Sequence, residues 1–255
     1  MLRPPPWVLR ASAVAYVVVT LTHLTALVVD ADALADVSQW LLMPTLAVVL
    51  LAATRWPRGR LVAWSLVALG FSFLGDFLPS RLSGDAAFLA MVGCFLLAQA
   101  SYVVAFAPLS GRSVARRRPL LVLPYTVVLV ALVGFCASHA GSMLVPVAVY
   151  GGVLTAMAVL ATGLGTVGAV GGAVFLVSDG LIALERFVPG WELPGQSVWV
   201  MATYALGQAL LVVAVVRVNR SSRRAPEAPA PATTSRAPKR DNVVALVAHP
   251  GGLPA

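Results

Sequence analysis

The sequence predicts an all-α membrane protein, built as a bundle of eight transmembrane helices. Of its 255 residues, 59% are hydrophobic and 11% are charged, and the mean hydropathy is +0.89. Soluble domains carry about 25% charged residues. Eight apolar runs of 18–24 residues can be drawn along the chain, and about 20 such residues cross a bilayer as one helix. Their approximate ranges are 8–29, 37–54, 61–79, 86–108, 119–137, 143–162, 165–188 and 197–218, which together make a transmembrane domain over residues 1–218.

Basic residues are concentrated in alternate loops between the apolar runs. Arginines precede the first run, lie at 55–60 and 112–118, and follow the eighth run, whereas Arg81 and Arg186 lie on the opposite side. Because cytoplasmic loops carry the excess of Lys and Arg, we expect both termini in the cytoplasm. This placement explains the net charge of +8 without nucleic acid as a partner. Abundant Arg, Ala, Val and Gly are typical of a high-GC bacterial genome, which favours the bacterial plasma (inner) membrane as the location.

The C-terminal segment, residues 219–255, differs from the rest of the chain in composition. It is rich in Pro, Ala, Arg and Ser, and such a segment buries too little apolar surface to become ordered. We therefore expect a disordered, basic cytoplasmic tail. An alternative is attraction to anionic lipids through the arginines at 217–224, at about 1 kcal/mol per basic residue near the surface.

Two aspartates lie inside stretches that otherwise have the composition of lipid-spanning helices. Asp76 ends the motif Phe-Leu-Gly-Asp, and Asp179 ends Leu-Val-Ser-Asp. A carboxylate at membrane depth costs roughly 2.5–3.5 kcal/mol on insertion scales, so we expect it to face a polar cavity or a partner. On the predicted topology both aspartates belong to helices that run outward, at comparable heights in the outer half of the membrane. We interpret them as a functional site, and the alternative is structural anchoring.

Further polar side chains accompany the aspartates on these and the following runs. The Gln and Tyr of the fourth run are spaced i, i+3, and those of the eighth run i, i+4, so each pair shares one helix face. A serine lies beside or one turn before each aspartate. For every one of these residues the alternative is a polar contact between helices. They are Ser72, Gln99, Tyr102, Ser178, Tyr204 and Gln208.

Other common catalytic groups are poorly placed for chemistry. The sequence has no Cys-x-x-Cys pair or metal-ligand spacing, and its separated histidines disfavour a His-based zinc hydrolase. No Gly-x-Ser-x-Gly nucleophile motif occurs. The residues concerned are Cys94, Cys136, His23, His139 and His249. Carboxylate acid–base chemistry is the chemistry that remains.

Five segments around the polar residues are similar to segments of known proteins. They are Leu-Met-Pro-Thr-Leu at 42–46, Phe-Leu-Gly-Asp-Phe-Leu at 73–78, Leu-Leu-Ala-Gln-Ala-Ser-Tyr-Val-Val-Ala-Phe at 96–106, Gly-Ala-Val-Phe-Leu-Val-Ser-Asp at 172–179 and Thr-Tyr-Ala-Leu-Gly-Gln at 203–208. In this order they resemble the YhhN/lysoplasmalogenase family of eight-helix membrane proteins, over roughly residues 37–218. The chain departs from the family at Gln39-Trp40, where Lys-Pro is usual, and at Gln99 and Gln208, where His is common.

The resemblance implies hydrolysis of the vinyl ether bond of lysoplasmalogens to a fatty aldehyde and a glycerophospho-alcohol. This reaction begins with protonation of the β-carbon and passes through an oxocarbenium ion. It therefore needs one protonated and one ionised carboxyl group, as in other paired-carboxylate sites. We expect Asp76 and Asp179 to be this acid/base pair, without a cofactor, acting on a lysophospholipid from the surrounding membrane lipids. The residues expected to bind the substrate are Gln99, Tyr102, Ser178, Tyr204 and Gln208.

Two alternative functions stay open at this stage. The first is a hydrolase of another lysolipid, because plasmalogens are scarce in many aerobic bacteria. The second is a proton-coupled transporter of a small molecule or lipid. In a transporter the two aspartates would serve as proton relays. The sequence predicts no oligomeric state and does not decide which aspartate is the acid.

Overall fold

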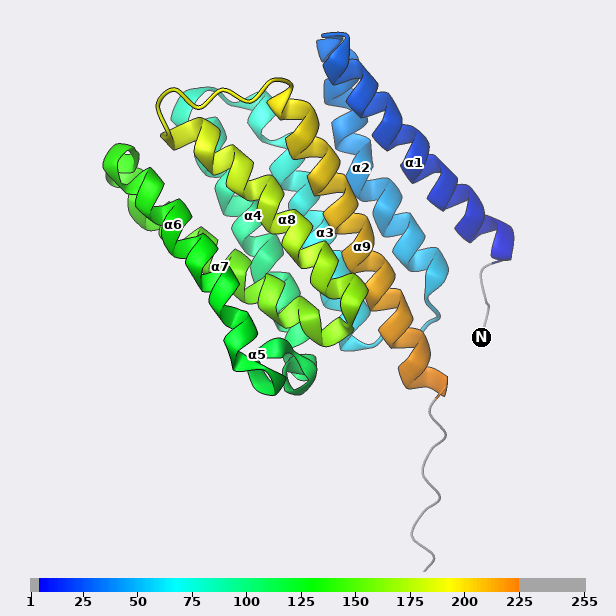
Figure 1. Ribbon diagram of the computed structural model, residues 1–255. Helices are drawn as coiled ribbons and strands as arrows, with labels where there is room; N and C mark the ends of the chain where they lie inside the picture. The colour runs from blue at the N-terminus through cyan, green and yellow to red at the C-terminus, as the bar shows by residue number, and fades with distance from the viewer. Residues whose placement is uncertain (1–4, 225–255) are drawn as a thin grey trace, which may run out of the picture. The chain divides into compact units, whose positions relative to one another are not determined.

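The computed structural model describes residues 5–224, and every regular element within them is helical. Eight of the helices are long and apolar enough to cross a membrane, which confirms the predicted fold class. Shorter helical segments connect them, among them α5 Val114–Arg117 and the 3₁₀ turn η1 Pro79–Arg81. The eight long helices are α1 Pro6–Val28, α2 Asp32–Ala53, α3 Arg60–Phe77, α4 Gly84–Phe106, α6 Leu123–Ala140, α7 Leu144–Ala161, α8 Thr166–Phe187 and α9 Gln196–Arg224 (Figure 1).

Several helix ends differ from the ranges expected from the sequence. α2 begins at Asp32 rather than near 37, and an acidic side chain in a first turn interacts favourably with the helix dipole. α6 begins at Leu123, after a 3₁₀ turn over Pro119–Val122. α9 continues to Arg224, so residues 219–224 of the expected tail are helical. The rest of that tail, residues 225–255, lies outside the described range.

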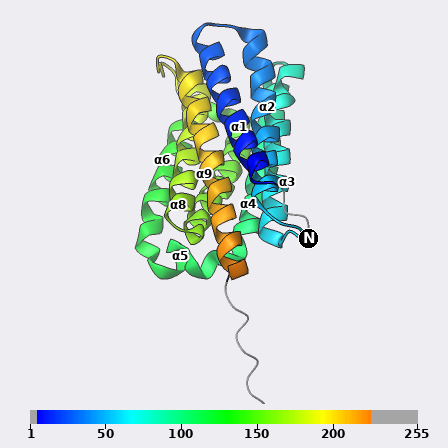
Figure 2. The same ribbon diagram turned by 90° about the vertical axis from the view of Figure 1, so that its right-hand side faces the viewer.

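Six of the long helices form a closed ring, in which each helix packs against its two neighbours. Their order around the ring is α2, α3, α4, α7, α8 and α9. α9 closes the ring, because it lies along α8 and also contacts α2 and α3. From outside, α1 covers α2 and α9, and α6 covers α7 and α8 (Figures 1 and 2). Side chains from segments far apart in the sequence therefore meet inside the ring.

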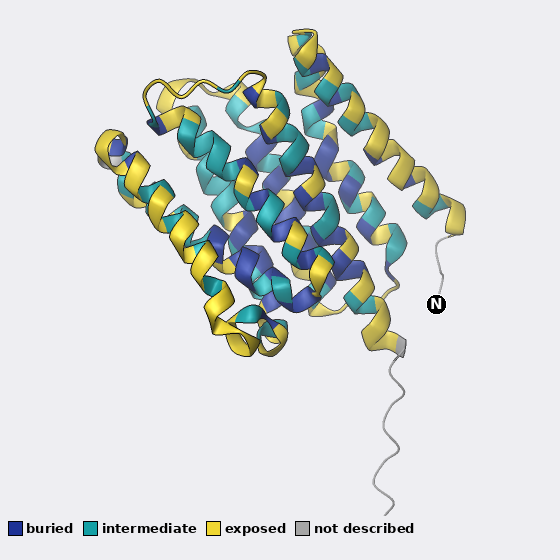
Figure 3. Ribbon diagram, in the orientation of Figure 1, coloured by how far each residue is buried: buried dark blue, intermediate teal, exposed yellow. Residues whose placement is uncertain are grey.

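The outward faces of the bundle are apolar. Buried residues gather in the middle of the ring, whereas α1 and α6 are largely exposed (Figure 3). Exposed apolar side chains include Val14 and Leu21 on α1 and Val130 and Phe135 on α6. In water such surfaces would promote association, whereas lipid hydrocarbon is a matching solvent for helices whose backbone groups are already bonded. These faces are those of an integral membrane protein.

Glycines allow α8 to pack closely against both of its neighbours in the ring. A Cβ atom on Gly172 would lie 2.9 Å from the Cα of Ala158 in α7. A Cβ atom on Gly171 would lie 3.0 Å from the backbone nitrogen of Leu211 in α9. Small residues permit this approach of helix backbones. The packing holds α8, which carries Asp179, firmly between α7 and α9.

Candidate active site

A cavity of about 290 Å³ lies between α2, α3, α4, α8 and α9. We call it the polar cavity, because Asp76 and Asp179 both line it. The structure thus brings together the two carboxylates that were singled out in the sequence. Its mouth lies where α2 begins and α3 ends, because the exposed residues Asp36 and Ser80 also belong to the lining. The other lining residues are Gln39, Gly75, Pro79, Met91, Phe95, Ser178, Ile182, Val200, Met201 and Tyr204.

Asp76, in the last turn of α3, is 6% exposed and is held from two other helices. The Tyr204 hydroxyl of α9 donates a hydrogen bond to Asp76 Oδ2 at 2.9 Å. The Gln39 side-chain amide of α2 donates to Oδ1 at 3.5 Å. Both carboxylate oxygens therefore have a donor, and such bonds stabilise the ionised form of a carboxyl group. Tyr204 is one of the expected site residues, whereas the contact with Gln39 was not expected.

Three fully buried polar side chains form a network one helical turn from Asp76. The Tyr102 hydroxyl of α4 donates to Gln208 Oε1 at 2.7 Å, and Gln208 Nε2 donates to the Ser72 hydroxyl at 3.0 Å. The network joins α3, α4 and α9, and its members lie outside the lining of the polar cavity. Of the Gln–Tyr pair on α9, Tyr204 therefore faces the cavity and Gln208 faces the network.

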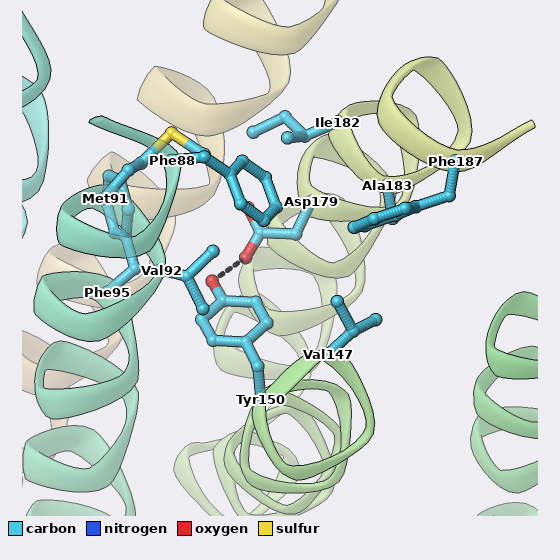
Figure 4. Close-up of a pocket in the computed structure, with 10 residues that line it drawn as sticks. All are labelled: Phe88, Met91, Val92, Phe95, Val147, Tyr150, Asp179, Ile182, Ala183 and Phe187. Atoms are coloured by element: carbon cyan, nitrogen blue, oxygen red, sulfur yellow. Dashed lines mark hydrogen bonds between the residues drawn. The ribbon is translucent and has the colours of Figure 1, made fainter. Parts of the chain in front are cut away.

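Asp179, in α8, is half-buried and has a different partner. The Tyr150 hydroxyl of α7 donates a hydrogen bond to Asp179 Oδ2 (Figure 4). Sequence reasoning missed Tyr150, because its apolar run contains no glutamine, and a Gln–Tyr pair on one helix face is the signal that drew attention to Tyr102. The hydroxyl of the neighbouring Ser178 also lies at the polar cavity and donates to the carbonyl oxygen of Val200 at 3.0 Å, which joins α8 to α9.

A second cavity, of about 50 Å³, adjoins the polar cavity at Asp179. Met91, Phe95 and Ile182 line both cavities together with that aspartate. Beyond these shared residues, Tyr150 is the one polar side chain among the described residues of the lining (Figure 4). The remaining walls of this apolar cavity are Phe88, Val92, Val147, Ala183 and Phe187. Asp179 therefore lies at the junction between a polar and an apolar cavity.

Gln99 of α4 has a setting unlike that of the other expected site residues. It is 0% exposed, and its side-chain amide has no hydrogen-bond partner within residues 5–224. It lies one turn after Phe95 and outside the lining of both cavities. Buried polar groups without a partner are rare in folded proteins. Its role in substrate binding stays a prediction.

The fold and the cavity together define the class of the protein. It is an integral membrane protein with two carboxyl groups inside one cavity, those of Asp76 and Asp179, and a third, that of the exposed Asp36, at the mouth. A tyrosine hydroxyl and a glutamine amide accompany them. Within the described part of the chain, no Lys, Arg or His lines that cavity. A site of this composition can transfer protons and stabilise a developing positive charge.

Comparison with protein families agrees with this class. The model of the YhhN family matches residues 34–215, which is most of the chain, and the chain therefore belongs to that family. The match confirms the resemblance identified from the sequence. It also contains all the residues named above as lining the two cavities.

Two relatives from mycobacteria share part of the sequence. A lysoplasmalogenase of Mycobacterium bovis and a lysoplasmalogenase of Mycobacterium tuberculosis are each 32% identical to the chain over 166 residues. The matched region covers 63% of this chain and 63% of each relative, which is less than two thirds of their length. No solved structure matches the chain.

Proposed function

We propose that the protein is a lysoplasmalogenase-like membrane hydrolase, which cleaves the vinyl ether bond of a lysoplasmalogen. The observation that carries the proposal is the position of Asp76 and Asp179 on one cavity, with Asp179 at the junction with an apolar cavity. A lysolipid has a polar head group, one aliphatic chain and the reacting bond between them, which matches this arrangement. The name of the mycobacterial relatives supports the same reaction.

The proposed reaction begins with the transfer of a proton to carbon. One aspartate, in its protonated form, gives its proton to the vinyl carbon β to the ether oxygen, and the π electrons form the new C–H bond. The α-carbon and the ether oxygen then share the positive charge of an oxocarbenium ion. The second aspartate, which is ionised, stabilises that ion electrostatically.

Water then completes the hydrolysis. A water molecule in the polar cavity adds to the α-carbon, and the aspartate that lost its proton accepts one from this water. The resulting hemiacetal breaks its bond to the glycerol oxygen, while its hydroxyl proton is passed to that oxygen. One water is consumed, a fatty aldehyde and a glycerophospho-alcohol are released, and both aspartates return to their starting protonation states.

Side chains around the two aspartates serve as positioning residues in this proposal. Tyr204 orients Asp76, and Tyr150 orients Asp179, through the hydrogen bonds described above. Ser178 lines the polar cavity and is the remaining expected residue that a substrate there would approach. Three further residues expected to bind the substrate line neither cavity, and substrate binding stays a prediction for them. They are Gln99, Tyr102 and Gln208.

We also infer that the protein resides in a bacterial plasma membrane with both termini in the cytoplasm. The arginine-rich loops support this orientation through the positive-inside rule. It places the mouth of the polar cavity, at Asp36 and Ser80, on the non-cytoplasmic side. A reporter fused after Arg224 should show the activity of a cytoplasmic enzyme, and activity of an exported reporter instead would reverse the orientation.

Incubation of the purified protein with a panel of lysolipids tests the reaction. The panel contains a lysoplasmalogen and its acyl and alkyl ether counterparts, and products are identified by mass spectrometry. We expect aldehyde from the vinyl ether alone, and a strong reduction in Asp76→Asn and Asp179→Asn. Asp32→Asn, which changes an exposed carboxylate at the start of α2, is the matched control and should keep full activity.

The other outcomes of the same panel identify the alternatives. Fatty acid released from the acyl lipid would indicate a hydrolase of different bond specificity. Proton-coupled flux across liposomes without any product would indicate a transporter. Full aldehyde release by both aspartate variants would refute the acid/base assignment.

A further inference from the structure

An arginine lies at the rim of the polar cavity, just outside its lining. Arg81 ends the 3₁₀ turn η1, in which the two preceding residues, Pro79 and Ser80, line that cavity. Its guanidinium carbon lies 5.4 Å from the ring centroid of Trp40 in α2 and 5.0 Å from that of Phe77 in α3. The two rings meet edge to face, with 5.2 Å between their centroids. The guanidinium group is therefore held against a pair of aromatic rings.

The two rings connect Arg81 to the segments that hold Asp76. Phe77 directly follows Asp76 in α3, and Trp40 directly follows Gln39, which donates a hydrogen bond to that carboxyl group. A cation over an aromatic ring is attracted by its π electrons, and the planar guanidinium group also stacks on such rings. These contacts restrict an otherwise flexible side chain, so less conformational entropy remains to be lost when a ligand binds to it.

The charge of Arg81 has no acidic partner among the described side chains. Arg81 is exposed, and the one ion pair within residues 5–224 joins Arg186 to Asp85 at 2.6 Å. Asp36, whose exposed carboxyl group lies at the same mouth, makes no ion pair with Arg81. A guanidinium group has five N–H donors in a planar fork, whose geometry matches the oxygens of a phosphate. Arg81 therefore offers these donors to an anion at the mouth of the polar cavity.

We propose that Arg81 binds the phosphate of the substrate's head group, and that Trp40 and Phe77 position it for this contact. The inference rests on the proposed function, because it takes the reacting bond to lie at Asp76 and Asp179 inside the polar cavity. It adds a residue that determines head-group specificity, and it assigns no step of the reaction to that residue.

The position of Arg81 suits the phosphate of a lipid whose reacting bond lies at Asp76. Arg81 follows Asp76 by five residues in the direction of the mouth, which corresponds to a rise of about 8–10 Å along helical segments. Its side chain lies back over Phe77, so the guanidinium group is outward of Asp76 by no more than that rise. The glycerol carbons of a lysolipid join its phosphate to the vinyl ether oxygen and can span this distance.

A second source of phosphate is the surrounding bilayer, because arginines near a membrane surface also contact its lipids. Binding is therefore measured in a non-ionic detergent, which contains no phosphate. The two ligands are a 1-O-alkylglycerol and the 3-phosphate of the same lipid, which lack the vinyl ether and differ only in the phosphate. Their affinities are determined by native mass spectrometry.

Arg81→Gln should weaken binding of the phosphate lipid about 10-fold and leave binding of the alkylglycerol unchanged. This factor is the lower end of the range for a hydrogen bond to a charged group, because Arg81 is exposed. Trp40→Leu keeps the charge but removes one ring, and should weaken binding of the phosphate lipid by a smaller factor, about 2- to 5-fold. In the wild type the preference for the phosphate lipid should fall as salt is added, and in Arg81→Gln it should change less.

Arg186→Gln is the matched control. It removes the same charge at the same end of the bundle, where the guanidinium carbon also lies over an aromatic ring, that of Phe88, at 5.1 Å. Arg186 is already paired with Asp85, however, so both affinities should stay at their wild-type values. Both arginines are exposed, and both variants should accumulate as folded protein.

The outcomes separate the phosphate contact from the reaction. Equal weakening of both lipids in Arg81→Gln, no weakening of either, or the same selective loss in Arg186→Gln refutes the contact, even where aldehyde is formed from the vinyl ether. A loss that occurs only in phospholipid nanodiscs also refutes it and assigns Arg81 to the phosphates of the bilayer. Selective weakening in detergent without any aldehyde from the vinyl ether supports the contact and refutes the proposed reaction.

Discussion

The two aspartates of the polar cavity differ in how the fold holds them. Asp76 is 6% exposed, and both of its oxygens accept hydrogen bonds, one from Tyr204 on α9 and one from Gln39 on α2. Asp179 is half-buried, and within residues 5–224 its carboxyl group accepts one side-chain hydrogen bond, from Tyr150 on α7. Among the described residues, each oxygen of Asp76 thus has a side-chain donor, whereas one oxygen of Asp179 has none and can face a substrate.

We infer from this difference that the two carboxyl groups have different roles. Donors directed at both oxygens stabilise negative charge, which suits Asp76 as the ionised group beside the oxocarbenium ion. Asp179 borders the apolar cavity, an environment that suits the apolar β-carbon of the vinyl group. An oxygen without a protein donor can carry the proton to that carbon, so we assign Asp179 as the acid. Separate environments also divide the roles of two carboxyl groups in other enzymes.

Asparagine substitutions test this assignment with the largest expected effect. Asp179→Asn removes the proton donor, and aldehyde release should fall about 10²–10⁴-fold. Asp76→Asn keeps the donor and removes a stabilising charge, so its loss should be smaller, about 10²-fold. The rates are compared in single-turnover reactions on equal amounts of folded protein. A larger loss in Asp76→Asn would exchange the two roles.

Phenylalanine substitutions of the two tyrosines test the same difference on a smaller scale. Tyr204→Phe removes a hydrogen bond to an ionised group, worth about 1.5–3 kcal/mol, and should lower kcat/KM at least about 10-fold. Tyr150→Phe removes a bond to a neutral acid, worth about 0.5–1.5 kcal/mol, and should lower it about 2- to 10-fold. Both variants keep the aromatic ring. Equal losses, or a larger loss in Tyr150→Phe, would contradict the assigned charges.

The fold and the two carboxylates could be predicted from the sequence for a physical reason. Every membrane crossing must be long and apolar, so composition along the chain is sufficient to show eight helices. A carboxyl group within such a helix is costly, so Asp76 and Asp179 can be identified as candidate site residues from the sequence alone. Neither inference requires knowledge of which helices pack together.

The partners of the aspartates could not be predicted, because they depend on helix neighbours in space. Sequence order suggests that Asp179 would meet the Tyr and Gln of the following helix. Instead Tyr204 of that helix bonds to Asp76, and Asp179 bonds to Tyr150 of the preceding helix. No periodicity within one helix encodes such a contact. The hydrogen bond from Gln39 to Asp76 likewise depends on how α2 packs against α3 and α9.

The last comparison concerns stability rather than reaction rate, and it sets two buried glutamines side by side. Gln208 bonds to Tyr102 and Ser72 beside Asp76, whereas Gln99 has no partner in the described part of the chain, although both amides are 0% exposed. Gln208→Leu leaves two buried hydroxyl groups unpaired, and each costs about 1–3 kcal/mol. The midpoint of thermal unfolding in detergent should therefore fall. Gln99→Leu removes an amide without a hydrogen-bond partner among residues 5–224 and should leave that midpoint unchanged or raise it.

The relative size of these two shifts bears on how the aspartates are held. If only Gln208→Leu lowers the unfolding midpoint, a complete polar network fixes the helices around Asp76. A carboxylate that stabilises a developing positive charge needs such a fixed position. Equal destabilisation in Gln99→Leu would mean that a buried water pairs with Gln99. A second polar network would then lie within one turn of Phe95, which lines both cavities. In that case Asp76 and Asp179 would differ less in how firmly they are held than the protein contacts alone indicate.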